Sequence, residues 1–172
     1  LGEVYEGQVP TPRHRVADAS PPTPRDGDLV SLGRFQLLAE LGRGGMGRVI
    51  EARDPELRRS VAVKVVVDPA EVTEAQLARF VAEAQITGQL EHPGIVPVHE
   101  LGVDESGQVY FTMKLVQGEE LGDKYDKVFA RDEEWNTTRA LGVLLRVCEA
   151  MSFAHSKGVI HRDLKPANVM VG

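Results

Sequence analysis

Apolar residues along the chain form short clusters first and helical stripes later. Five short apolar clusters are bounded by glycine, proline or acidic turns. They predict strands at residues 35–41, 48–52, 60–67, 95–103 and 109–115, and the third is rich in β-branched residues, which favour extended backbone. The first three strands are expected to form an antiparallel meander.

One helix is predicted among these strands, over residues 73–90. Thr73 and Gln76 match a capping box, in which each side chain satisfies a free backbone N–H at the start of the helix. The spacing i, i+3, i+4 and i+7, which places side chains on one helical face, is occupied by Leu77, Phe80, Val81 and Ala84. This face is expected to pack on the sheet.

From residue 121 onward the pattern is helical. An apolar stripe that ends near Gly158 is formed by Leu141, Leu144, Leu145, Cys148 and Met151. A short loop is predicted at residues 161–168, and a strand follows it. The pattern indicates an α+β fold in which a five-stranded antiparallel part with one helix precedes a mainly helical part.

The first residues of the chain differ from the rest. Five of the ten prolines fall between Pro10 and Pro24, among polar residues with almost no apolar periodicity. Such a segment buries too little to offset its chain entropy, so residues 1–33 are predicted to be a disordered tail or linker. Residues 34–118 and 119–172 are predicted to be the two structured parts. The chain starts at Leu1 and ends within a strand pattern, so both ends are expected to be cut.

Composition narrows the class of protein. A net charge of −6 and a pI near 5.4 give no reason to expect nucleic acid as a partner. Cys148 is the one cysteine, so no intrachain disulfide can form, and a reducing, cytoplasmic setting is expected. We expect Cys148 to be a small core residue. No apolar run is long enough to span a membrane, so any membrane anchor is expected outside this segment.

The glycine cluster between the first two predicted strands is a candidate phosphate-binding segment. Gly42, Gly44 and Gly47 also match a dinucleotide fingerprint, but that motif requires a helix after it, and here a strand follows. Glycines between two antiparallel strands can make a flap whose backbone amides approach phosphate oxygens. A simple hairpin turn is the alternative that the glycines alone leave open.

A lysine interrupts the third predicted strand. Lys64 follows Val61-Ala62-Val63, and a charged group in a core strand requires a partner. The candidate is Glu83, three residues after Phe80 at the edge of the apolar stripe. A Lys64–Glu83 pair would direct the ammonium at phosphate oxygens. The other interpretation is a lysine extending to solvent at a strand edge, with Glu83 solvated on the helix.

The loop at residues 161–168 decides between these interpretations. It reads His161-Arg162-Asp163-Leu164-Lys165-Pro166-Ala167-Asn168 and matches the H-R-D-L-x-x-x-N catalytic loop. With the glycine cluster and the V-A-x-K segment in the same order, residues 34–172 resemble the eukaryotic-like protein kinases. The amino-acid sequences of the glycine cluster and of Lys165-Pro166-Ala167-Asn168 are most similar to those of bacterial serine/threonine kinases. The resemblance implies a two-lobed kinase fold with a five-stranded N-lobe and the start of a mainly helical C-lobe.

The resemblance also implies a role for each motif residue. The flap, with Gly42, Gly44, Gly45 and Gly47, is expected to cover the phosphates of ATP, and Lys64 to contact the α- and β-phosphates while Glu83 holds it. Asp163 is expected to accept or orient the proton of the attacking hydroxyl. Lys165 is expected to neutralise charge on the transferred group, and Asn168 to bind Mg²⁺. Arg162 resembles the arginine of kinases switched on by a phosphorylated activation loop.

The adenine pocket follows from the same resemblance. Val49 and Ala62 are expected on one face of the base and Met170 on the other, with Met113 as gatekeeper. Glu120 is expected to meet the ribose hydroxyls. The remaining residues expected to bind the nucleotide are Leu41 and the hinge, Lys114, Leu115 and Val116. Ordinary core packing is the alternative for Val49, Ala62 and Met170.

The resemblance predicts an enzyme that transfers the γ-phosphate of ATP to a protein serine or threonine. The Asp-Phe-Gly metal motif and the activation loop do not occur in the 172 residues, so this piece itself is expected to be inactive. Two alternatives remain, a pseudokinase that binds ATP as a regulatory module and a small-molecule phosphotransferase of related fold. Lys64, Glu83, Asp163 and Asn168 argue against the first, and Arg162 with Lys165-Pro166 against the second.

Overall fold

The fold was obtained as a computed structural model, which describes residues 31–44, 47–66, 72–132 and 134–172. Residues 1–30 of the predicted tail over residues 1–33, and Gly45, lie outside the described residues. Among the described residues, no helix is long and apolar enough to cross a membrane.

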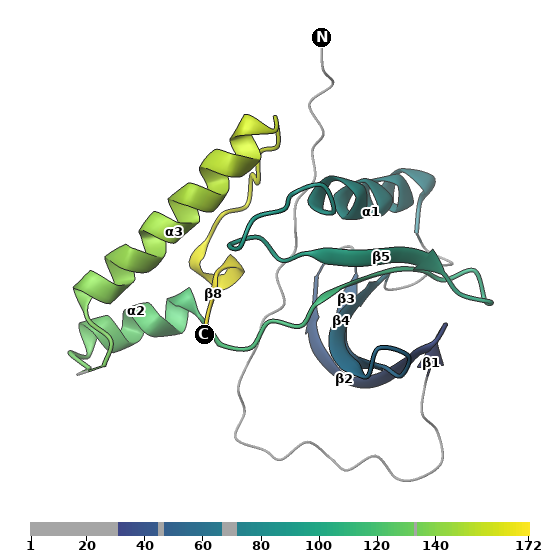
Figure 1. Cartoon of the computed structure of the whole chain (residues 1–172), viewed down its shortest axis with the longest axis horizontal. Coiled ribbons are helices and arrows are strands. Elements are labelled where there is room, and N and C mark those ends of the chain that lie inside the picture. Colours follow the sequence, from purple (N-terminus) through teal and green to yellow (C-terminus); the bar gives the residue numbers. More distant parts are fainter. Residues whose placement is uncertain (1–30, 45–46, 67–71, 133) are drawn as a thin grey trace.

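An antiparallel sheet forms the first part of the molecule (Figure 1). Its strands are β1 (Ser31–Leu32), β2 (Phe35–Arg43), β3 (Arg48–Asp54), β4 (Arg59–Val65), β5 (Val98–Val103) and β6 (Val109–Lys114). They lie in the order β1-β2-β3-β4-β6-β5. The five predicted strands are present and β2, β3 and β4 form the predicted meander.

The expectation of a five-stranded sheet was wrong by one strand, because β1 pairs with β2 at its edge. Two residues are too few to show a period-2 pattern, which is why the sequence gave no sign of it. Leu32 is nonetheless buried in the core. The ordered part therefore begins before Arg34, where order was expected to start.

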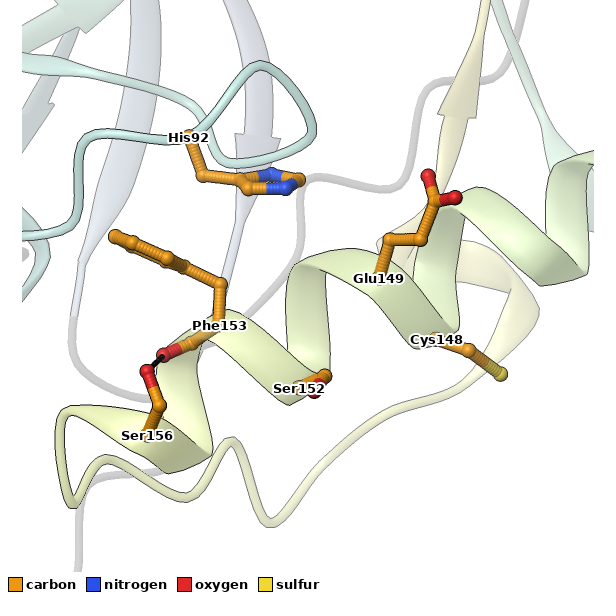
Figure 2. A pocket seen from close by; sticks show the side chains of 6 residues that line it. All are labelled: His92, Cys148, Glu149, Ser152, Phe153 and Ser156. Carbon is orange, nitrogen blue, oxygen red and sulfur yellow. Dashed lines mark hydrogen bonds between the residues drawn. The ribbon is translucent and has the colours of Figure 1, made fainter.

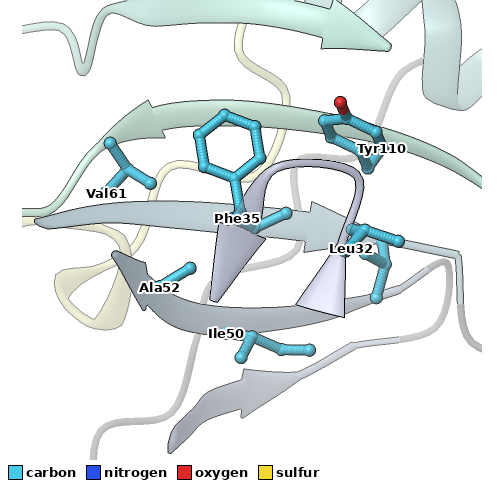
Figure 3. Close-up of a cluster of buried hydrophobic side chains, with 8 residues drawn as sticks. Leu32, Phe35, Ile50, Ala52, Val61 and Tyr110 are labelled. Atoms are coloured by element: carbon cyan, nitrogen blue, oxygen red, sulfur yellow. The ribbon is translucent and has the colours of Figure 1, made fainter. Parts of the chain in front are cut away.

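The two faces of the sheet carry two separate apolar clusters. On one face the cluster consists of Leu32, Phe35, Ile50, Ala52, Val61, Val63, Val65 and Tyr110 (Figure 3). The other face packs on α1 (Glu74–Thr87) through Val66, Phe80, Ala84 and Phe111. Since side chains alternate along a strand, the odd-numbered valines of β4 fill the first cluster, and Lys64 points to the α1 face.

Helix α1 begins where the sequence predicted. The N–H of Gln76 donates to Thr73 Oγ1 (3.2 Å) and the N–H of Thr73 donates to Gln76 Oε1 (2.9 Å), so the capping box is complete. Phe80 and Ala84, from the predicted stripe, are buried. The rings of Phe80 and Phe111 lie 5.1 Å apart, which fixes α1 on the sheet.

The contact between Phe80 and Phe111 leads to a prediction about stability. Because Phe80 is fully buried, Phe80→Ala leaves a cavity and is expected to cost about 3–5 kcal/mol. Hydrogen exchange of the α1 and β4 amides, measured on the full-length protein by mass spectrometry, checks this locally. Leu57→Ala is the control, since Leu57 is exposed. Unchanged protection in Phe80→Ala contradicts the packing described here.

A charged cluster that sequence patterns did not predict joins the turns at one end of the sheet. Asp54 was read only as part of a turn, yet it is fully buried. Its Oδ1 accepts from the N–H of Glu56 (3.1 Å) and Leu57 (3.2 Å), and lies 3.6 Å from Arg34 Nε. Burial opposes ionisation, but the Leu57 amide and Arg34 lower the pKa of Asp54 below its usual value. Arg34 also pairs with Glu100, so it braces β5 as well.

The second part of the molecule is mainly helical and lies beside the sheet (Figure 1). Its elements are β7 (Glu119–Glu120), α2 (Leu121–Phe129), α3 (Thr137–Ser156), a 3-10 turn (Pro166–Asn168) and β8 (Met170–Val171). Strand β8 pairs with β7, so the chain after the predicted loop returns to the segment that leaves the sheet.

The buried face of α3 differs from the predicted one. Its buried residues are Ala140, Ala150 and Ala154, whereas the predicted stripe residues Leu141, Leu144, Leu145 and Cys148 are exposed. The expectation that Cys148 is a core residue was therefore wrong for the described structure. Periodicity finds an apolar face but does not show what covers it.

Candidate active site

A buried ion pair joins the sheet to α1. Lys64 Nζ lies 2.6 Å from Glu83 Oε1 and 2.7 Å from Glu83 Oε2, and the two side chains are 3% and 8% exposed. The pairing predicted from the sequence is thus present, and the interpretation of a lysine extending to solvent is excluded. Burial lowers the pKa of Lys64, and the Glu83 carboxylate offsets part of this effect.

The surroundings of Lys64 explain its position. Its ammonium lies 5.8 Å from the centre of the Phe80 ring and 5.5 Å from that of Phe111, so two aromatic rings and a carboxylate enclose it. The capping box sets where α1 begins, and the packing of Phe80 then places Glu83, three residues later, over β4. Strand β4 and helix α1 together therefore fix the position of the Lys64 ammonium.

The glycine segment lies between two antiparallel strands, as predicted. Gly42 pairs with Val49 across β2 and β3, the Gly44 N–H donates to the Gly47 carbonyl (2.8 Å), and a strand follows. A Cβ on Gly47 would lie 2.4 Å from the Val65 carbonyl oxygen, so only glycine fits there. The strand that follows excludes the dinucleotide fingerprint, whose third glycine opens a helix.

The loop after α3 gathers three of the predicted catalytic residues. Lys165 Nζ lies 2.9 Å from Asp163 Oδ2, and Asn168 Nδ2 donates to the Asp163 carbonyl oxygen (2.5 Å) and less closely to Oδ2 (3.3 Å). The hydrogen bond from Lys165 lowers the pKa of Asp163 most, desolvation opposes it, and the hydrogen bond from Asn168 adds a smaller lowering. Asp163 is therefore ionised at neutral pH and suited to accept a proton.

Register shows which of the predicted adenine-pocket residues lie together. Val49 is opposite Lys64, and Ala62 is opposite Met113, so these four side chains share the α1 face of the sheet. Glu120 is opposite Met170 in the β7–β8 pair. Leu41 and the hinge residues Leu115 and Val116 are partly buried, and Lys114 is exposed.

The three motifs fall within a region that matches a known protein family. The model of the protein kinase domain matches residues 35–172, which include all three motifs. The chain belongs to the protein kinase family. Members of this family use ATP and Mg²⁺ and phosphorylate proteins, and the two-part architecture is a kinase N-lobe followed by the beginning of a C-lobe.

Several bacterial kinases are similar to this chain. Serine/threonine-protein kinase PknA of Mycobacterium tuberculosis is 39% identical over 153 residues, covering 87% of this chain and 34% of that protein. Serine/threonine-protein kinase PknD of Protochlamydia amoebophila is 36% identical over 146 residues, covering 80% of this chain and 15% of that protein. The kinase chain thus spans a minor part of these relatives' length.

Solved structures support the fold. The crystal structure of the Mycobacterium tuberculosis PknI kinase domain matches with a TM-score of 0.63 and 28% identity. The match covers 84% of this chain and 57% of that one. The predicted α+β, protein-kinase-like fold is therefore confirmed.

The donor set of the kinase loop fits a magnesium ion. Asn168 carries an amide oxygen and lies against the Asp163 carboxylate, and hard oxygen ligands of this kind suit Mg²⁺. In the part of the chain that the structure describes, no group of three or more His, Cys, Asp or Glu could hold a metal. Mg²⁺ takes few protein ligands and completes its shell with phosphate and water oxygens.

Sequence reasoning gave no role to His161. Its Nδ1 accepts from the Asp163 N–H (3.3 Å), and it packs where burial lowers its pKa, so the neutral ring holds the backbone of the kinase loop. Its place at the head of the motif was the signal that could have found it.

An open pocket on the flank of α3 lies apart from these residues. It has a volume of about 580 Å³ and is lined by His92, Cys148, Glu149, Ser152, Phe153 and Ser156 (Figure 2). The His92 and Phe153 rings lie 5.3 Å apart on its border. None of the residues predicted to bind ATP lines it, so it takes no part in the candidate active site.

Proposed function

We propose that this chain supplies the nucleotide-binding and catalytic-loop part of a protein serine/threonine kinase that transfers the γ-phosphate of ATP to protein hydroxyls. The observation that carries the proposal is the Lys64–Glu83 pair, in which a charge that is costly to bury is held by two short contacts. Structural packing alone gives no reason to retain a lysine in a valine-rich strand, whereas phosphate binding does.

Each residue has a role that its geometry supports. Lys64, held by Glu83, binds the α- and β-phosphates, and the backbone amides of the flap cover them. Asp163 orients the substrate hydroxyl and accepts its proton, while Lys165, adjacent to it, neutralises charge on the transferred group. Asn168 would hold Mg²⁺, which supplies charge neutralisation at the phosphates when bound. Phosphoryl transfer relies on this positioning because it needs little covalent chemistry from the protein.

The adenosine part of ATP would lie between the two lobes. Val49 and Ala62 contact one face of the base and Met170 the other, with Leu41 and Met113 at the border. Backbone groups of the hinge, residues 114–116, hydrogen-bond the adenine edge, and Glu120 meets the ribose. Support comes from register, which places Val49, Ala62 and Met113 on the face that carries Lys64. We also propose a cytoplasmic location for the domain, since it consumes ATP and the chain cannot form an intrachain disulfide.

The test is phosphorylation by the full-length protein. Incubation with MgATP and candidate protein substrates, followed by mass spectrometry, is expected to yield phosphoserine or phosphothreonine. Phosphate found only on a sugar or an antibiotic contradicts the proposal. ATP binding without any phosphorylated protein supports the pseudokinase alternative instead.

The chain of 172 residues by itself is expected to transfer negligible phosphate. No Asp-Phe-Gly segment occurs in it, and loss of one metal ligand removes much of the charge neutralisation on which the reaction depends. Autophosphorylation of the isolated chain, measured by incorporation of labelled phosphate next to the full-length protein, checks this. Comparable rates for the two proteins contradict it.

A further inference from the structure

An ion-pair bracket lies just beyond the hinge. Glu119 Oε1 lies 2.6 Å from Lys124 Nζ, and Glu119 Oε2 lies 2.7 Å from Lys127 Nζ. Each carboxylate oxygen therefore has its own ammonium, and such charge-assisted contacts are stronger than neutral hydrogen bonds. The Lys124 side chain is only 16% exposed and its ammonium lies 5.2 Å from the centre of the Trp135 ring. The Glu119 side chain thus links β7 to two successive turns of α2.

The backbone at Glu119 is fixed as well. Gly118 has a φ of +147°, and a Cβ there would lie 2.4 Å from the Val171 carbonyl oxygen, so the backbone just after the hinge runs against β8 with no spare room. Glu119 pairs with Val171, and Leu121 N–H donates to the Val169 carbonyl (2.8 Å). The close approach at Gly118 and the ion pairs of Glu119 thus restrain the same short segment, residues 118–120.

Helix α2 begins at a residue that does not cap it with its side chain. Glu120 is the N-cap residue, its backbone is extended, and its side chain makes no capping hydrogen bond. A helix start without a side-chain cap gains definition from other contacts near it. Lys124 and Lys127 provide these contacts by binding Glu119.

We propose that Glu119 is a positioning residue for nucleotide binding, which acts through Lys124 and Lys127 to fix the orientation of the neighbouring Glu120 toward the ribose. The proposal rests on the proposed function, in which Glu120 meets the ribose hydroxyls. It also assigns different tasks to two adjacent carboxylates. Glu119 is engaged by α2, and because its two lysines lower its pKa to about 2, it stays ionised and paired at neutral pH.

The test compares two nucleotides in the full-length protein. Wild type and Glu119→Gln are titrated with MgATP and with the magnesium complex of 2′,3′-dideoxy-ATP, which lacks the ribose hydroxyls. Glutamine keeps the shape but loses the charge, so Glu120 is expected to lose its fixed orientation. ATP affinity should then fall roughly ten-fold or more, the size of one charged hydrogen bond, while dideoxy-ATP affinity stays unchanged.

Matched variants complete the test. Asp123→Asn makes the same charge change at an exposed site in the first turn of α2 and should alter neither affinity. Lys127→Gln removes one arm of the bracket and should give a smaller loss confined to ATP, which keeps the test valid if Glu119→Gln folds poorly. Equal weakening of both nucleotides indicates a structural role and overturns the inference. A preference for ATP over dideoxy-ATP that stays as in wild type also overturns the inference. Wild type that binds neither nucleotide refutes the proposed function itself.

Discussion

Asp163→Asn is expected to lower the rate of phosphoryl transfer by the full-length protein by about 10³-fold, within the 10²–10⁴ range typical of a lost general base. Asparagine can keep the contact geometry with Asn168 and Lys165 but accepts no proton. The structure shows why Asp163 suits the task, because Lys165 and Asn168 lower its pKa and keep it ionised at neutral pH. Nucleotide affinity is expected to change little, since the phosphates are bound mainly from the N-lobe.

Single-turnover kinetics and MgATP titration of the same preparation separate these two effects. Asp126→Asn, on the exposed side of α2, is the matched control and should retain the wild-type rate. A rate within ten-fold of wild type in Asp163→Asn removes Asp163 from the mechanism. A large loss of ATP affinity instead indicates that its main role is structural.

Lys64→Met is expected to destabilise the N-lobe as well as abolish tight ATP binding. It leaves the Glu83 carboxylate buried without its partner, and breaking a buried pair in this way costs about 3–5 kcal/mol. The double variant Lys64→Met with Glu83→Leu replaces both charges by apolar groups. Its stability is expected to return close to wild type, because such replacements are often neutral.

The double variant separates stability from function. ATP affinity should stay low in it even though the fold is restored, since no ammonium remains to bind the phosphates. Hydrogen exchange of the α1 and β4 amides reports the stability, and MgATP titration reports the function. Recovery of ATP binding in the double variant means that Lys64 contributes only to folding.

The active-site residues could be predicted better than β1 or the buried face of α3. The reason is that their positions follow from their spacing along the sequence. Glu83 could be assigned to Lys64 because a capped helix with a stripe through Phe80 fixes which side chains face the sheet. The catalytic loop was readable because Asp163, Lys165 and Asn168 lie within six residues, so their contacts depend on local backbone alone.

Features that depend on distant contacts were not predictable. β1 is too short to show a pattern, and Asp54 looks like any turn residue until Arg34 meets it from the turn between β1 and β2. The exposed face of α3 was misassigned because periodicity cannot tell which neighbour covers a stripe. Glu119 escaped notice for a similar reason, since its partners are five and eight residues away, across the boundary between β7 and α2.

A crystal structure of the full-length protein with Mg²⁺ and a non-hydrolysable ATP analogue shows whether both lobes bind the same nucleotide. We expect one nucleotide with its α- and β-phosphates within hydrogen-bond distance of Lys64 Nζ, its γ-phosphate next to Asp163, and Mg²⁺ on Asn168. A nucleotide bound elsewhere, or one that reaches Lys64 while Asp163 faces a separate surface, contradicts it.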